Sequence, residues 1–108
     1  MDGSAGARTG WAWQPWMREG EHVDLAQDGK ANTGYPHMDP DTYRQMVLLF
    51  QRSGVPVGTH AVGDRAMDWV VDTYALAEIR FPHANLRHSI RETPPASPDI
   101  LRRTSIAA

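Results

Sequence analysis

The chain has 108 residues, enough for one domain or for part of one. Its 11 Lys and Arg against 13 Asp and Glu give a formal net charge of −2, and the basic residues are scattered, so we expect no nucleic-acid partner. The absence of cysteine excludes disulfides and thiolate metal sites and fits a reducing compartment. No stretch approaches the ~20 apolar residues that span a bilayer, and residues 1–8 lack the basic and apolar regions of a signal peptide. We therefore expect a cytoplasmic chain with no membrane partner.

Residues 1–38 are rich in Gly, Asp, Asn and Trp and show little periodicity, which predicts one loop-rich segment with local turns. Turn signals occur at Asp28-Gly29 and at Asn32-Thr-Gly34. Loops of this length are uncommon in compact domains and are often functional lids.

Residues 39–108 alternate between helical and strand patterns. Asp39-Pro40 predicts the start of a helix, and Gly54 predicts its end in a left-handed cap. The apolar run 55–59 predicts a short strand that ends at His60. A second helix is predicted to begin at Asp64. The apolar residues expected to face the core from the two helices are Tyr43, Met46, Val47, Phe50, Met67, Val70, Val71 and Tyr74.

Further along the chain, Leu86-Arg-His-Ser-Ile90 predicts a second strand, Ser97 a third helix, and residues 105–108 the start of another strand. This order is typical of a parallel sheet covered by helices. The two strand ends are about 31 residues apart, the spacing of units in a (β/α)₈ barrel of ~250 residues. We therefore expect an α/β fold, a partial TIM barrel with a long amino-terminal loop. Unpaired strand edges would then contact the remainder of the barrel or a second copy.

His60 is the strongest candidate for chemistry, because catalytic residues of barrels lie at the carboxyl ends of strands. It could bind a metal or act as a general base without one, or it could be a hydrogen-bonded core histidine. Asp64 could orient His60, although a plain helix cap is the simpler interpretation. Arg65 is most simply an ion-pair partner near the start of the helix.

Other candidates allow structural and functional interpretations side by side. His88 lies within the second predicted strand and could have a structural or a direct role. The glycine-spaced segment 2–9, which includes Arg8, could cradle an anion, but it lacks the lysine of a phosphate-binding loop. Trp11, Trp13 and Trp16 could pack against the core or line an apolar substrate pocket.

Two blocks resemble a known family. Thr59-His-Ala-Val-Gly-Asp-Arg-Ala-Met-Asp68 is similar to a block of the metal-dependent amidohydrolases, in the branch that includes N-substituted formamide deformylase. Asp2-Gly-Ser-Ala-Gly-Ala-Arg-Thr9 resembles the block after that branch's fourth barrel strand. The segment at Gly34, the helix after Asp39 and the strand at 86–90 follow in family order, so the resemblance covers nearly the whole chain.

The resemblance implies a metal-dependent hydrolase of non-peptide C–N bonds, with this chain covering about strands five to seven of its barrel. His60 would then ligate a divalent metal, most simply zinc, and a metal-activated water would attack a small amide or formamide. Asp64, Arg65, His88 and Arg8 would support the metal or the substrate.

The chain also departs from the family pattern. The family's ligating histidine of strand six is replaced at Arg91-Glu92, where Glu92 is either a substitute metal ligand or an exposed glutamate. The His-x-His of strand one, the bridging lysine and the aspartate of strand eight are absent from these 108 residues. The alternative is therefore a catalytically inactive fragment or an interaction remnant without a complete metal site.

Overall fold

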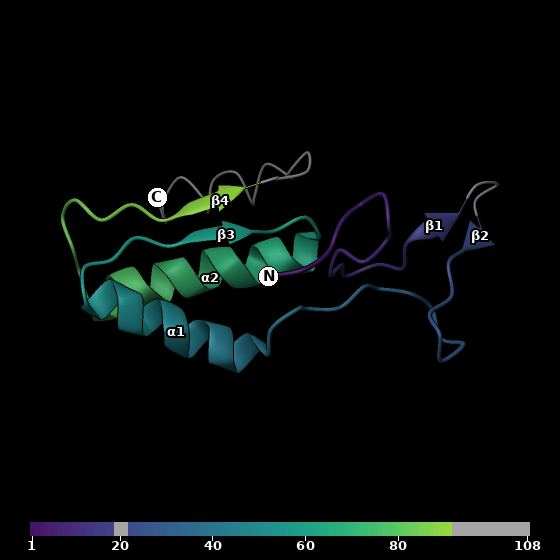
Figure 1. Ribbon diagram of the computed structural model, residues 1–108, viewed down its shortest axis with the longest axis horizontal. Coiled ribbons are helices and arrows are strands. Elements are labelled where there is room, and N and C mark those ends of the chain that lie inside the picture. Colours follow the sequence, from purple (N-terminus) through teal and green to yellow (C-terminus); the bar gives the residue numbers. More distant parts are fainter. Residues whose placement is uncertain (19–21, 92–108) are drawn as a thin grey trace.

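The computed structural model describes residues 1–18 and 22–91 as a mixed α/β arrangement of two helices and two small sheets (Figure 1). A helix-and-sheet body, residues 37–91, holds α1 (Pro40–Arg52), β3 (Gly58–His60), α2 (Asp64–Arg80) and β4 (Ser89–Arg91). An arm, residues 12–18 and 22–35, extends from it and holds β1 (Met17–Arg18) and β2 (His22–Val23). The molecule is accordingly elongated, with extents of 48 × 27 × 17 Å.

The body is a two-layer unit in which helices cover one face of a parallel strand pair (Figure 1). β3 and β4 are parallel, with Gly58 opposite Ser89, Thr59 opposite Ile90 and His60 opposite Arg91. α2 connects the two strands, and α1 packs against α2. This confirms the predicted alternation of helix, parallel strand, helix and parallel strand.

The start of α1 follows the predicted cap chemistry. The Asp39 side chain accepts a hydrogen bond from the Thr42 backbone N–H at 3.0 Å, and Pro40 is the first helical residue. Beyond the end of the helix, Gly54 has φ of 76°, which confirms the left-handed cap. α2 begins at Asp64 as predicted, but its cap residue is Gly63 and not Asp64, which is already helical.

The core lies between the helices and the strand pair. All four apolar residues predicted for α2 are buried, which confirms its apolar face. On α1, Tyr43 and Val47 are buried as predicted, whereas Gln51 takes a fully buried position that the apolar pattern did not indicate. The main buried cluster consists of Trp11, Tyr43, Val47, Ala61, Ala66, Val70, Tyr74 and Ala77, with Met67 and Val71 beside it under Ile90.

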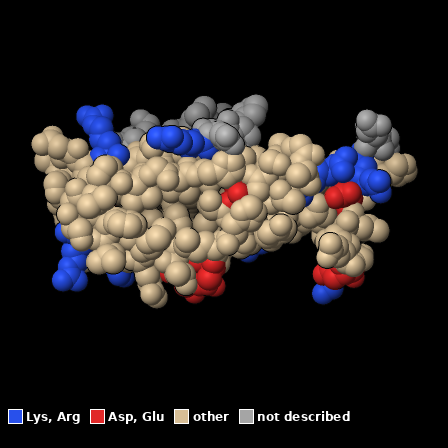
Figure 2. Space-filling view, viewed as in Figure 1, with Lys and Arg blue, Asp and Glu red and all other residues tan. Residues whose placement is uncertain are grey.

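The arm is less regular, and it contains two short strands that we did not predict. β1 and β2 pair antiparallel, and Leu25 bridges to Ala31. Both predicted turns are present, with φ of 81° at Gly29 and 70° at Gly34. Basic and acidic side chains lie beside one another at the end of the arm (Figure 2).

Candidate functional site

His60 lies at the carboxyl end of β3 and on the face of the sheet away from the helices. Side chains alternate along a strand, so Thr59 and His60 point to opposite faces. Thr59 is buried towards the helices, where its hydroxyl lies 2.6 Å from Tyr43 Oη and 2.7 Å from Tyr74 Oη. His60 therefore projects from the open face, where the inner side chains of a barrel would lie.

The amino-terminal segment holds the His60 ring in place. His60 Nε2 lies 2.6 Å from the Gly3 carbonyl oxygen. A carbonyl can only accept, so Nε2 carries the proton in this hydrogen bond. A histidine metal ligand typically donates its other N–H to a carbonyl or a carboxylate in this way. Gly3 thus orients His60, a role for which Asp64 was a candidate.

Asp2 joins the two sequence blocks that resemble the amidohydrolases. Its buried carboxylate accepts hydrogen bonds from the backbone N–H groups of Trp11 at 2.7 Å, Val62 at 3.0 Å and Gly63 at 2.8 Å. Three donors converging on one carboxylate compensate for its loss of water. The role of Asp2 was missed, since a single aspartate before a glycine has no distinguishing pattern in the sequence.

Asp64 and Arg65 fasten the arm to α2. Asp64 Oδ1 accepts a hydrogen bond from the Trp13 backbone N–H at 2.9 Å, and Asp68 accepts one from the Trp13 indole at 2.7 Å. The Arg65 guanidinium lies 4.6 Å from the ring centre of Trp11 and 4.7 Å from that of Trp13. These are cation–π contacts and not the ion pair that we expected for Arg65.

The three tryptophans have different surroundings. Trp11 is buried in the core, with its ring centre 6.3 Å from that of Trp69. Trp16 donates its indole N–H to the Gly10 carbonyl at 2.8 Å. Trp13 remains 54% exposed. Packing therefore accounts for Trp11, whereas Trp13 lies at the surface.

His88 lies just before β4 and its two ring nitrogens are both engaged in the body. Nδ1 accepts the Val57 backbone N–H at 2.9 Å, so Nε2 carries the proton and donates it to Gln51 Oε1 at 2.5 Å. Burial lowers the pKa of His88, and the nearby Glu78 carboxylate partly opposes that shift. His88 is thus a neutral, structural histidine on the helix side of the sheet.

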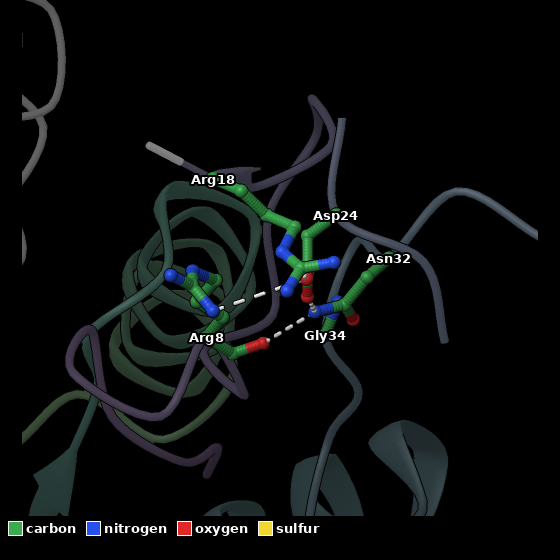
Figure 3. Close-up of polar contacts among 5 residues, drawn as sticks. All are labelled: Arg8, Arg18, Asp24, Asn32 and Gly34. Carbon is green, nitrogen blue, oxygen red and sulfur yellow. Dashed lines mark hydrogen bonds and ion pairs between the residues drawn. The ribbon is translucent and has the colours of Figure 1, made fainter. Parts of the chain in front are cut away.

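Arg8 lies in the arm junction, where it adopts a left-handed conformation with φ of 55° (Figure 3). Its guanidinium is 3.9 Å from Asp24, which also lies 3.6 Å from Arg18. The Asn32 amide donates to both the Arg8 carbonyl and the Asp24 carboxylate at 2.8 Å. This arrangement closes the arm onto residues 3–10 and does not direct Arg8 towards His60.

The described residues supply no complete metal site. Within residues 1–18 and 22–91, no three His, Asp or Glu side chains come together in a group that could hold an ion. Glu92, Ser97 and residues 105–108 lie outside the described residues. His60 fits the chemistry of one nitrogen ligand, and the other ligands would have to come from elsewhere.

Neither helix in the described part of the chain is long and apolar enough to cross a membrane. Comparison with protein families finds no matching family model, and no solved structure gives a significant match. The chain is similar to Protein LONG AFTER FAR-RED 3 of Arabidopsis thaliana, with 30% identity over 74 residues. That match covers 68% of this chain and 11% of the relative, so the chain spans only a small part of its relative's length.

Proposed function

We propose that this chain is a segment of a metal-dependent amidohydrolase barrel, in which His60 ligates a divalent metal that acts on a non-peptide C–N bond. The observation that carries the proposal is the position of His60 at the end of a parallel strand, on the face opposite the helices. Its ring is oriented by a backbone carbonyl of the other family-like block.

The edges of β3 support the barrel part of the proposal. At the edge of β3 that faces β4, the Val57 carbonyl accepts a hydrogen bond from the Ser89 N–H at 2.9 Å. At the same edge the Ala61 N–H donates to the Arg91 carbonyl at 3.2 Å. His60 O faces the other edge, because the bonding groups of successive residues alternate between the two edges. There it accepts a hydrogen bond from Met1 N at 2.7 Å. β3 therefore has backbone neighbours on both sides, as an interior strand of a larger sheet would.

When bound, a divalent ion in such a site lowers the pKa of a water and polarises the amide carbonyl. The residues described here have narrower tasks. His60 supplies one nitrogen, Gly3 holds its ring, and Asp2 fixes the loop after β3 against the amino-terminal segment. Since one ligand does not hold zinc, the 108-residue chain by itself should not catalyse the reaction.

The first test is to read the coding sequence on both sides of residues 1–108. The proposal expects a His-x-His strand and a lysine upstream, and a late strand ending in aspartate downstream. Unrelated sequence on both sides would overturn it.

The restored protein should hydrolyse N-substituted formamides or N-acyl amines. His60→Ala should lower this hydrolytic activity by more than a hundredfold. The matched control is His83→Ala, which changes an exposed histidine.

Treating the restored protein with a metal chelator distinguishes a metal-dependent reaction from one in which His60 acts as a general base without metal. Loss of activity on chelation and recovery with zinc is the expected result. Activity that survives chelation but is lost in His60→Ala would replace the proposal with a metal-free general base.

The exposed apolar side chains of the arm favour a second candidate function, in which the chain is an interaction segment with no catalytic role. Its apolar side chains are unusually exposed, with Leu25 61%, Tyr35 53%, Met17 49% and Val23 45% accessible. Such exposure suits packing against the remainder of a barrel or against a second copy of this chain. Sedimentation of the 108-residue chain tests whether it self-associates. This candidate function predicts a dimer, and Leu25→Asp should dissociate it into monomers.

A further inference from the structure

The face of α1 that points away from the core carries opposite charges at its two ends. We name it the outer face of α1, and its members are Asp41, Gln45, Leu48, Leu49 and Arg52. At 3.6 residues per turn, these side chains lie within about 100° of one another around the helix. The centre of the outer face lies roughly 140° from that of the buried residues Tyr43, Val47 and Gln51. The outer face is thus directed away from the strand pair. The helices of a barrel form its outer ring, so this face would stay at the surface of a complete barrel as well.

The middle of the outer face is largely apolar and accessible. Leu49 is 58% exposed, whereas Leu48 is half-buried because it also packs against the core. Together with the end of α2, these side chains form a shallow groove of about 250 Å³, which is lined by Gln45, Leu48, Leu49, Arg52, Arg80 and Phe81. An apolar groove on the surface suits contact with apolar side chains of another molecule.

The ends of the outer face carry charges that have no partner within the described part of the chain. Asp41 lies in the first turn of α1 and Arg52 in its last, and both are exposed. They are about 16 Å apart along the helix, too far to pair with each other. Arg80 adds a second basic side chain beside Arg52. The ion pairs among the described residues all involve Asp24 in the arm. Figure 2 shows acidic side chains near the start of α1 and basic ones near its end.

A two-fold axis makes the outer face complementary to itself. When a second copy lies antiparallel, with the axis at the middle of the face, Asp41 of each copy is level with Arg52 of the other. Gln45 is then level with Leu48 of the second copy, and the two Leu48 positions are about 4.5 Å apart along the helix direction. A crossing angle of about 20° at an interaxial distance of roughly 8–10 Å keeps both charged ends within reach. One contact would thus form two ion pairs around an apolar centre.

We propose that the outer face of α1 binds a second copy of this chain and forms an antiparallel α1–α1 dimer. The inference goes beyond the proposed function, since it needs no metal and no catalytic group. A single helix face buries less than the ~1,200 Å² of a stable complex, so the dimer is weak. Its ion pairs lie at the rim of the contact, where salt screens them, so raising the ionic strength should weaken the dimer further.

Sedimentation equilibrium of the 108-residue chain at low salt tests the proposal. As the concentration rises to about 1 mM, the average mass should increase from 12.1 kDa towards twice that value. Asp41→Lys and Arg52→Glu each replace two ion pairs of the dimer with two like-charge pairs. Each should therefore raise the dissociation constant at least about tenfold. A chain that stays monomeric over this range would overturn the proposal.

Matched controls show whether the position of the charge matters or only the net charge. Asp28→Lys and Arg87→Glu make the same charge changes at exposed residues away from α1. Both should dimerise like the unchanged chain. Equal weakening by these controls and by the α1 variants would overturn the proposal.

A mixture of the two α1 variants gives the sharpest result. The outer face of Asp41→Lys is basic at both ends, and that of Arg52→Glu is acidic at both ends. A mixed pair therefore joins opposite charges at each end, so the mixture should form a heterodimer although each variant alone is monomeric. Circular dichroism checks that both variants keep their helices. A mixture of folded variants that remains monomeric, when the unchanged chain dimerises, would overturn the proposal.

Two leucine variants distinguish the outer face of α1 from the arm. Leu49→Asp places a charge at the middle of the proposed contact and should dissociate the dimer, whereas Leu25→Asp changes the arm and should not. Both leucines are exposed, at 58% and 61%, so neither change should unfold the chain. Dissociation by Leu25→Asp but not by Leu49→Asp would overturn the α1 dimer and place the self-association in the arm.

Discussion

The body and the arm of this molecule are held together by different forces. In the body, seven residues of one buried cluster pack together with Trp11 between two helices and a strand pair. In the described arm no residue is buried, and backbone bonds and the Asp24–Asn32 pair hold its shape. Apolar burial dominates folding free energy, while hydrogen bonds accessible to water contribute little. The body should therefore unfold as a unit, and the arm should open locally at a lower free energy.

A matched pair of methionines tests this contrast with the largest expected effect. Met67 on α2 is fully buried, whereas Met17 in the arm is 49% exposed. Met67→Ala should lower the free energy of unfolding by about 3 kcal/mol, through lost burial and a cavity. Met17→Ala should change it by less than about 0.5 kcal/mol. Urea denaturation measures both, and equal losses would mean that the arm belongs to the same cooperative unit.

Removing the charge of Asp2 should loosen the junction between the amino-terminal segment and the loop after β3. Asp2→Asn replaces one acceptor oxygen with an amide NH₂ that faces backbone N–H donors. We expect a loss of about 2 kcal/mol, the cost of leaving buried donors unpaired. Asp28→Asn is the control, because Asp28 accepts only a turn bond from Lys30 at an exposed position. A similar loss in both variants would contradict a special role for Asp2.

Lowering the pH should reduce the free energy of unfolding of the body, because His88 titrates. Its pKa lies below the ordinary 6.5, because burial disfavours the charged ring. Above pH 6.5 the ring is neutral in both the folded and the unfolded chain, so the stability contribution is fully present. As pH falls below that value only the unfolded chain binds the proton, and stability declines until the folded pKa is reached. Denaturation midpoints between pH 7 and 5 measure this slope.

The slope should be smaller in His88→Gln, which cannot titrate, and unchanged in His83→Gln, where the histidine is exposed. An identical slope in all three proteins would show that other groups cause the acid sensitivity.

The smallest expected effect concerns the contact between arm and body. Trp13→Ala removes the indole hydrogen bond to Asp68 and the aromatic ring that lies against the Arg65 guanidinium, while the backbone bond to Asp64 remains. We expect a loss of about 1 kcal/mol. Limited proteolysis should then cut the arm faster while the body stays intact. Trp13→Phe keeps an aromatic ring over Arg65 and should show an intermediate rate. Unchanged cleavage in both variants would mean that Trp13 does not fasten the arm.

The body was largely predictable because its signals are local. Helix caps at Asp39 and Gly54 and the apolar spacing on α2 depend on residues a few positions apart. Gln51 was missed because its burial depends on partners far along the chain, namely His88, Glu78 and Phe81. The strands are shorter than predicted, since pairing extends only over three residues in each.

The candidate site was predictable in position and less so in its contacts. The pattern of an apolar run followed by histidine placed His60 at a strand end. Its contact with Gly3 joins residues 57 positions apart, which no local pattern records. For the same reason we expected Asp64 and Arg65 to have partners close to them in sequence, whereas the structure pairs them with Trp11 and Trp13.

Gly63, in the loop after β3, is constrained by the backbone packing of the fold, unlike His60. A Cβ on Gly63 would lie 1.9 Å from the Trp11 carbonyl oxygen, so no other residue fits where these two backbones cross. Selection for folding alone would preserve Gly63 even in related proteins in which His60 had changed. In a survey of natural variants, an unchanged Gly63 would therefore mark a shared fold, while variation at His60 would count against the proposed metal-binding role.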